Sequence, residues 1–231
     1  MIMAVPERMA NVLSTIEYLD ADVRVVLDQR RGGNPWATRA KGLESFIGEH
    51  GWVLMLQDDV VVCRNLMAAC DAIAREATRY CFVSLYASSR CVRELRHNTY
   101  RSHRYLEVSD WVSGPASMIR CSEIPSLLEW ADRNVPAGYI NDDHVMGRYC
   151  STHSPALMVL PSLTDHLDTP STVHARGMPK RKATMFVGED FDASSLDYSM
   201  PDEIPHLVRD PRRPRSFVPV ASSSRTGTLA K

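Results

Sequence analysis

The sequence predicts a single-domain α/β protein with three layers and a mostly parallel central sheet. Its 231 residues are enough to bury a sizeable core. In the first 86 residues, short apolar runs alternate with stretches of helical periodicity, which is typical of parallel strands joined by helices. The longest apolar runs, such as 53–56, are far too short to span a bilayer. We therefore expect a soluble protein whose ligands bind at the carboxyl ends of parallel strands.

The first half of the chain has the clearest pattern. The expected strands are 2–5 (stopped by Pro6), 23–27, 52–57 and 81–86, and the expected helices are 7–19, 36–47 and 65–78. The β-branched run 23–27 suits a strand that is buried on both faces.

The second half is more irregular. Residues 90–104 are polar and basic, which suggests a loop or hairpin. The expected strands are 111–119 and 156–160, and the expected helices are 122–133, capped by Ser122, and 141–149. From about Asp190 the chain is polar and rich in Pro, Ser and Arg. We expect a domain over 1–189 and an extended or disordered tail over 190–231.

Charge and cysteine content exclude some classes of protein. Lys and Arg number 27 against 28 Asp and Glu, so the net charge of −1 gives no global argument for nucleic acid or an acidic membrane. The six cysteines form no CxxC pair and no zinc-like cluster with histidine. Because no secretory signal precedes the first strand, we expect reduced, mostly buried thiols in a cytoplasmic protein.

Two adjacent acids, Asp58 and Asp59, follow the apolar run VLML and precede VVV. Neighbouring carboxylates repel each other and lose hydration unless a cation or hydrogen bonds compensate. At the end of a buried strand they suit Mg²⁺ or Mn²⁺, which take carboxylates together with substrate phosphates. The simpler alternative is a turn, or a helix cap at Asp59.

Other polar residues fall near the same predicted edge of the sheet. Asp28 follows the second strand and either accepts a hydrogen bond from a nucleotide or only begins a Gly-Gly loop. Basic residues on the loops and helix starts of this edge suit phosphate, although a solvated surface position is the simpler reading of each. They are Arg8, Arg30, Arg31, Arg39 and Lys41.

A second acidic pair, Asp142 and Asp143, opens the helix expected at 141–149. Helix capping requires only one such residue, so the pair also suggests a general base beside an acceptor hydroxyl. His166 follows the strand expected at 156–160, and a lone histidine is more often structural than a ligand.

Taken in order, LQDDV, VRVVLDQ, ATRAKGL, WVSGPASMI and PSLTDHLDTPST resemble motifs of the GT-A-fold glycosyltransferases, up to about residue 187. The resemblance implies a GT-A-like, Rossmann-like fold with a donor half at 1–86 and an acceptor half at 87–189. Gln57 stands where the family's metal motif has its first acid. Asp59 would then bind the metal, and Asp58 the donor ribose, or the metal through water.

The resemblance also implies roles for the other candidates. Asp142 or Asp143 would be the catalytic base in an inverting enzyme, and His166 would join Asp59 at the metal. The implied donor site comprises Pro6, Arg8, Asp28, Arg39, Asp58, Gly114, Arg181 and Lys182.

A compact core with LQDD and PSLxDH is also similar to small glycosyltransferases encoded by bacteriophages, some of which modify hydroxymethylated bases of phage DNA. This implies a DNA acceptor in the host cytoplasm, contacted by the basic segments 90–104 and 209–215. An enzyme acting on a base must also flip that base out of the stack.

The sequence therefore predicts a hexosyl- or pentosyltransferase that uses a nucleotide sugar, with a UDP-sugar favoured, and Mn²⁺ or Mg²⁺. No membrane partner is expected. Another metal-dependent phosphate enzyme (a nucleotidyltransferase or phosphohydrolase) and a non-catalytic nucleotide-sugar-binding protein remain alternatives, and inversion or retention stays open.

Overall fold

A central mixed sheet organises the computed structural model, which describes residues 1–28, 33–87, 103–167, 169, 182–209 and 217–219. The strands are β1 (Ile2–Ala4), β2 (Val25–Leu27), β3 (Trp52–Gln57), β4 (Val60–Val62), β5 (Phe82–Ser84), β6 (Tyr105–Val108), β7 (Ala116–Arg120), β8 (Ala156–Val159), β9 (Thr164–His166), β10 (His206–Arg209) and β11 (Phe217–Pro219). The helices are α1 (Met9–Leu19), α2 (Pro35–Glu44), α3 (Leu66–Glu76), α4 (Ile124–Asn134) and α5 (Asp142–Thr152), with 3-10 turns η1 (Pro6–Arg8), η3 (Cys121–Glu123) and η4 (Ala193–Ser195).

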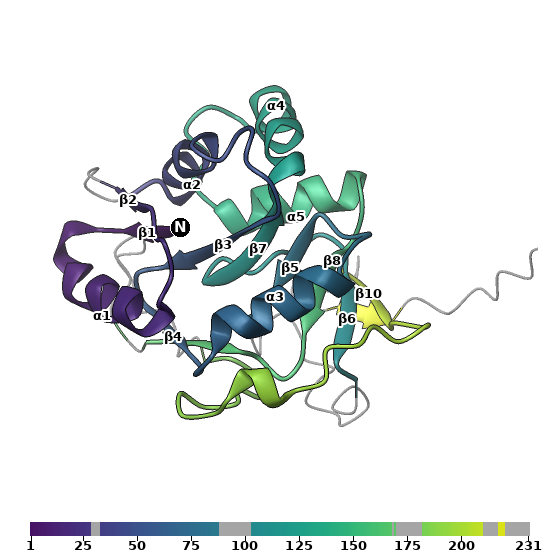
Figure 1. Cartoon of the computed structure of the whole chain (residues 1–231). Coiled ribbons are helices and arrows are strands. Elements are labelled where there is room, and N and C mark those ends of the chain that lie inside the picture. Colours follow the sequence, from purple (N-terminus) through teal and green to yellow (C-terminus); the bar gives the residue numbers. More distant parts are fainter. Residues whose placement is uncertain (29–32, 88–102, 168, 170–181, 210–216, 220–231) are drawn as a thin grey trace, which may run out of the picture.

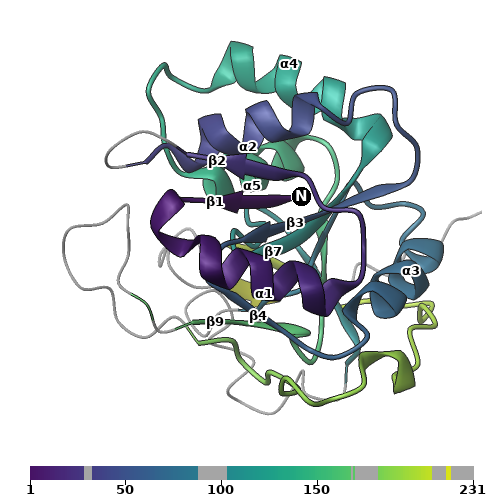
Figure 2. The same cartoon turned by 60° about the vertical axis from the view of Figure 1, so that its left-hand side comes forward.

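Within the described residues, nine strands form one sheet in the order β11-β10-β6-β8-β5-β7-β3-β1-β2. Six of them (β1, β2, β3, β5, β8 and β11) run in one direction, and β6, β7 and β10 run in the other. Helices α1 and α3 cover one face, and α2, α4 and α5 cover the other (Figures 1 and 2). The predicted three-layer, mostly parallel α/β fold is confirmed.

The strand period of two assigns side chains to the two layers of core. In β3, Val53 and Met55 pack with the core under α2, α4 and α5, whereas Leu56 faces the core under α1 and α3. The same alternation separates Met3 from Ile2 in β1. β3 lies between β1 and β7 and is covered on both faces, so its carboxyl end lies in the interior of the sheet.

Two local predictions are wrong. The run at 23–27 is not buried on both faces: β2 is an edge strand that pairs with β1, and Leu27 is 39% exposed. Ser122 does not cap a helix, because η3 intervenes and α4 begins at Ile124, after Glu123 at the N-cap position.

The predicted extended or disordered tail is also wrong for residues 190–209. This segment packs on the rest of the chain: Ala193, Tyr198 and Leu207 are buried, and β10 pairs in parallel with β6. The apolar residues involved are spaced irregularly among polar ones, so no periodic pattern marks them. A second small sheet of β4 and β9 was likewise not predicted.

The cysteines of the described segments agree with the expectation of mostly buried, reduced thiols. Cys63, Cys70, Cys121 and Cys150 are buried free thiols, and burial raises the pKa of Cys63 to about 12. Cys91 lies outside the described residues. In the part of the chain that the structure describes, no helix is long and apolar enough to cross a membrane.

Gly147 gives a test of the packing of α5. A Cβ atom at this position would lie 2.5 Å from the Asp110 carbonyl oxygen and 2.8 Å from Trp111 Cα, both of which are backbone atoms. We expect Gly147→Ala to destabilise the protein by roughly 1–3 kcal/mol in urea unfolding. Helix propensity alone would stabilise it by about 1 kcal/mol, so a gain in stability would contradict this packing.

Candidate active site

The predicted site residues meet at one edge of the sheet. Strands β1 and β3 are parallel with Met3 opposite Gln57, so their carboxyl ends lie together. β7 is antiparallel to β3 and begins at this edge, where the Gln57 N–H donates to the Pro115 carbonyl. The ends of two parallel strands and the start of β7 therefore surround Asp58.

Asp58 and Asp59 form the turn between β3 and β4, and both are buried. Arg8 bridges them: its Nη1 lies 2.8 Å from Asp58 Oδ1 and 2.6 Å from Asp59 Oδ2. The Val5 N–H donates to Asp58 Oδ2 at 2.7 Å. The turn that we considered as the simpler alternative is present, but its two carboxylates face inward and are compensated by a guanidinium and a backbone donor.

The local sequence explains how Arg8 reaches this position. Pro6 follows β1, is exposed and opens the 3-10 turn η1, which returns the chain so that the Arg8 N–H donates to the Val5 carbonyl. Burial opposes the charge on the guanidinium, but the Asp59 and Asp58 carboxylates outweigh it and raise the pKa of Arg8. Burial raises the pKa of Asp58, against the hydrogen bonds from Val5 and Arg8.

His166 approaches Asp59 through the second sheet. β4 and β9 are antiparallel with Val60 opposite His166, and the Leu167 N–H donates to the Asp59 carbonyl. This pairing places His166 Nε2 3.5 Å from Asp59 Oδ2, with both side chains buried. The predicted proximity of the acidic pair and the histidine is thus present.

The orientation of His166 fits a metal ligand. Its Nδ1 lies 2.7 Å from the Leu167 carbonyl oxygen, which can only accept, so Nδ1 carries the proton. Its Nε2 is buried, has no hydrogen-bond partner among the described residues and faces Asp59. Metal-binding histidines commonly donate their second ring N–H to a carbonyl in this way. Among the described residues no three His, Cys, Asp or Glu side chains form a metal-binding group, so an ion here would also need oxygen atoms from a substrate.

Arg39 is not placed as the sequence implied. Its side chain is fully buried and donates to Asp142 Oδ2 through Nε at 2.8 Å and Nη2 at 2.6 Å. Nη2 also donates to the Gly114 carbonyl at 2.8 Å. With no exposed surface, the Arg39 side chain is not accessible to a ligand in this structure. It instead positions Asp142 against the segment that precedes β7.

Asp143 is the more accessible member of the second acidic pair. It opens α5 beside buried Asp142, and its Oδ1 accepts the His144 N–H. Burial and the neighbouring Asp142 carboxylate raise the pKa of Asp143. A methyl group at Gly114 would lie 3.5 Å from Gln57 Nε2 and 3.7 Å from Asp143 Cβ. Gly114 is therefore packed closely between the end of β3 and the acidic pair Asp142 and Asp143.

The remaining candidates lie around the same edge or outside the described chain. Asp28 Oδ2 accepts the Asn34 N–H and closes the loop after β2, which agrees with its simpler predicted role. Lys182 donates to the His166 carbonyl at 2.8 Å and pairs with Asp165 at 3.2 Å. Arg181, Arg30 and Arg31 lie outside the described residues.

Sequence reasoning missed Asp165. Its Oδ1 accepts the Ala183 N–H while its Oδ2 pairs with Lys182, so it fixes the chain beyond β9 near His166. The DH dipeptide before LDTP was the available signal, but the side chain's partner is distant in sequence.

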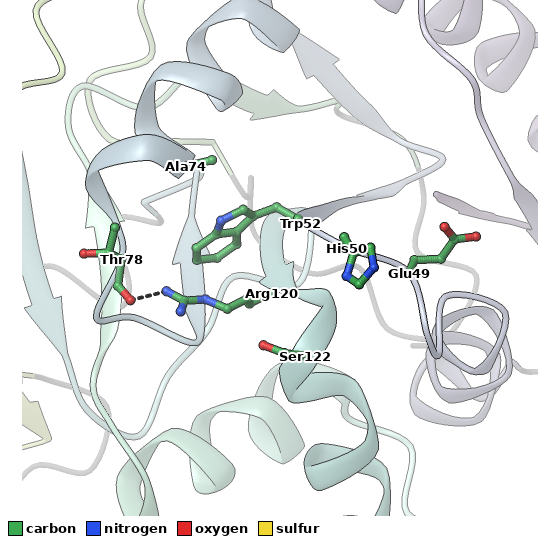
Figure 3. Close-up of a pocket in the computed structure, with 8 residues that line it drawn as sticks. Glu49, His50, Trp52, Ala74, Thr78, Arg120 and Ser122 are labelled. Carbon is green, nitrogen blue, oxygen red and sulfur yellow. Dashed lines mark hydrogen bonds between the residues drawn. The ribbon is translucent and has the colours of Figure 1, made fainter.

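Two surface cavities lie away from these residues. One, of about 290 Å³, is lined by Trp52, Arg120 and neighbours at the opposite end of β3 (Figure 3). There Arg120 stacks on Trp52 and donates to the Thr78 carbonyl. The other, of about 410 Å³, lies between α3 and residues 194–199. Neither cavity is lined by a predicted site residue.

The Arg39–Asp142 pair gives a direct test of the buried geometry. We expect Arg39→Met to cost about 3–5 kcal/mol in urea unfolding, because it leaves a buried carboxylate uncompensated. Adding Asp142→Asn should recover part of that loss, and the double-mutant cycle measures the coupling. Additive losses would show that the two side chains do not interact as described.

Comparisons with known proteins give little further guidance. No protein-family model matches the chain. No curated protein matches it either. Among solved structures, the chain is similar to A197 from STIV, with 17% identity and a TM-score of 0.43 over 82% of this chain and 95% of that one.

Proposed function

We propose that the protein is a metal-dependent glycosyltransferase that moves a sugar from a nucleotide-sugar donor to an acceptor hydroxyl. One observation carries this proposal: Asp59 and His166 converge beside Arg8, while Asp142 and Asp143 lie next to Gly114 at the same sheet edge. A site for a cation and a diphosphate therefore adjoins a site for a general base. The GT-A resemblance of the motifs supports the same assignment.

The donor half would hold the leaving diphosphate. Asp59 and His166 would bind Mn²⁺ or Mg²⁺, which supplies Lewis-acid stabilisation of a developing diphosphate charge. Arg8 and Lys182 would provide further positive charge around that group, and Arg8 can donate to phosphate in a bidentate fashion. Asp58, hydrogen-bonded to Val5, would face the ribose from the end of β3.

In the acceptor half the two acids divide their roles. Arg39 fixes Asp142 in the interior, so Asp142 is a positioning residue. Asp143 is partly exposed and its pKa is raised, which makes it the better base. Asp143 would take the proton of the acceptor hydroxyl as that oxygen bonds to the anomeric carbon and the bond to the diphosphate breaks. This displacement inverts the anomeric configuration.

The acceptor remains the hydroxymethylated DNA base proposed from the sequence. Of the basic segments 90–104 and 209–215, only 103, 104 and 209 lie among the described residues. The choice of a DNA acceptor and of a UDP-sugar donor therefore rests on the resemblance. The site geometry supports a diphosphate-containing donor and Asp143 as the catalytic base.

Substitutions in the donor half and in the acceptor half distinguish a glycosyltransferase from the alternative functions. With Mn²⁺ and a panel of nucleotide sugars, the wild type should release a nucleoside diphosphate. Asp59→Asn should lose nearly all turnover, and Asp143→Asn should lose about 10²- to 10⁴-fold of acceptor-dependent transfer while retaining donor binding. Arg75→Gln serves as the control, because Arg75 is exposed in the last turn of α3, next to the cavity at the opposite end of β3. Release of a nucleoside monophosphate would favour a nucleotidyltransferase, and an intact donor would favour a binding protein.

The pH dependence of transfer provides a separate test. The base must be ionised, so the rate should fall as the pH is lowered through the pKa of Asp143. Because that pKa is raised, the fall should begin at a higher pH than for an ordinary aspartate. The measurement is kcat/KM against pH, with circular dichroism confirming the fold. An acidic limb at the position of an unperturbed carboxyl would contradict the assignment of Asp143.

A further inference from the structure

Arg8 and a divalent cation would use the same oxygen atom. Asp59 Oδ2 lies 2.6 Å from Arg8 Nη1 and 3.5 Å from His166 Nε2. Asp59 Oδ2 is therefore the oxygen that faces His166 Nε2, and it already accepts a charge-assisted hydrogen bond from Arg8. The same Nη1 also donates to Asp58 Oδ1 at 2.8 Å, so one guanidinium nitrogen holds both acids.

Simultaneous binding in this arrangement is unfavourable. A hard divalent ion lies about 2.0–2.6 Å from its oxygen ligands, which would bring it within a few ångströms of the guanidinium charge. Two positive charges at such a distance in a buried site repel strongly, because the local dielectric is low. The cation must therefore compete with Arg8 for the carboxylates unless Arg8 gains another anionic partner.

A diphosphate supplies that partner. It places negative oxygens beside the metal, and a guanidinium donates to phosphate oxygens in a geometry that it also uses for carboxylates. Arg8 lies in the same 3-10 turn as exposed Pro6, and 11% of its side-chain surface is accessible. The freed carboxylates would then be available to the ion.

We propose that Arg8 holds Asp58 and Asp59 against divalent cations until a diphosphate draws its guanidinium away. Metal and diphosphate then bind cooperatively, each raising the affinity of the other by the same factor. The inference rests on the metal and diphosphate site of the proposed function but not on sugar transfer. It assigns Arg8 two positions, one on the acids and one on the diphosphate.

The test uses calorimetric titration of the full chain with Mn²⁺, alone and with saturating inorganic diphosphate, at free Mn²⁺ concentrations set by a metal buffer. In the wild type, diphosphate should tighten Mn²⁺ binding by about 5- to 150-fold. Arg8→Gln should bind Mn²⁺ alone at least about fivefold more tightly than the wild type, and its enhancement by diphosphate should be smaller.

Two control variants separate competition from a general charge effect. Lys182→Gln removes a positive charge near His166 that pairs with Asp165 and not with Asp59, so it should change Mn²⁺ affinity less than Arg8→Gln. Arg75→Gln removes an exposed charge at the opposite end of β3 and should leave both titrations unchanged. If Arg8→Gln does not fold, Arg8→Lys keeps the charge but loses bidentate phosphate contact, and should also show a reduced enhancement.

The outcomes distinguish this inference from the proposed function. Wild-type binding of Mn²⁺ and diphosphate without mutual enhancement would overturn the competition and leave the transferase proposal standing. Unchanged or weaker Mn²⁺ binding by Arg8→Gln would also overturn it. Absence of Mn²⁺ binding by the wild type, with or without diphosphate, would overturn both the inference and the metal site on which the proposed function depends.

Discussion

Two adjacent carboxylates at the end of a buried strand impose the main physical constraint on this protein. Asp58 and Asp59 repel each other and lose hydration where β3 turns into β4, so the fold must supply compensating donors. The donors are the N–H of Val5, which lies between β1 and η1, and the guanidinium of Arg8 in η1. The packing of β1 against β3 and the course of the first turn thus depend on satisfying these two charges.

A second buried acid on the other side of Gly114 is also compensated by an arginine. Buried Asp142 is compensated by fully buried Arg39, which comes from α2 and is far away in sequence. Removing either partner would leave an isolated buried charge, which costs much more than the pair itself contributes. The two arginines differ in one respect: Arg39 is enclosed, whereas Arg8 lies at the edge of the site. In our proposal, this difference makes Arg39 a positioning residue and lets Arg8 respond to a ligand.

The sequence predicted those parts of the structure that depend on local patterns. Apolar periodicity identified β1, β3, β5 and the helices that flank them, and the acids that follow β3 were found because charge rarely interrupts such a run. The edge position of β2 could not be predicted, because edge and central strands with the same β-branched residues look alike. The packing of 190–209 was missed because Ala193, Tyr198 and Leu207 lack periodic spacing.

The residues themselves predicted the types of side chain in the candidate site, whereas the pairing of Asp59 with His166 came from the resemblance to the GT-A family. Asp59 and His166 were both candidates, yet their contact depends on the register of β4 and β9, which no local pattern specifies. The pairing of Arg39 with Asp142 was not predicted, because the two residues are far apart in sequence and Arg39 was assigned to the surface or to the donor.

The central claim is that Asp59 and His166 bind a divalent cation together with a diphosphate. An anomalous-difference map of a crystal grown with Mn²⁺ and a nucleoside diphosphate tests it most directly. The account predicts a peak within about 2.5 Å of both Asp59 Oδ2 and His166 Nε2, completed by phosphate oxygens. A peak elsewhere, or one that lacks His166 Nε2 as a ligand, would contradict it.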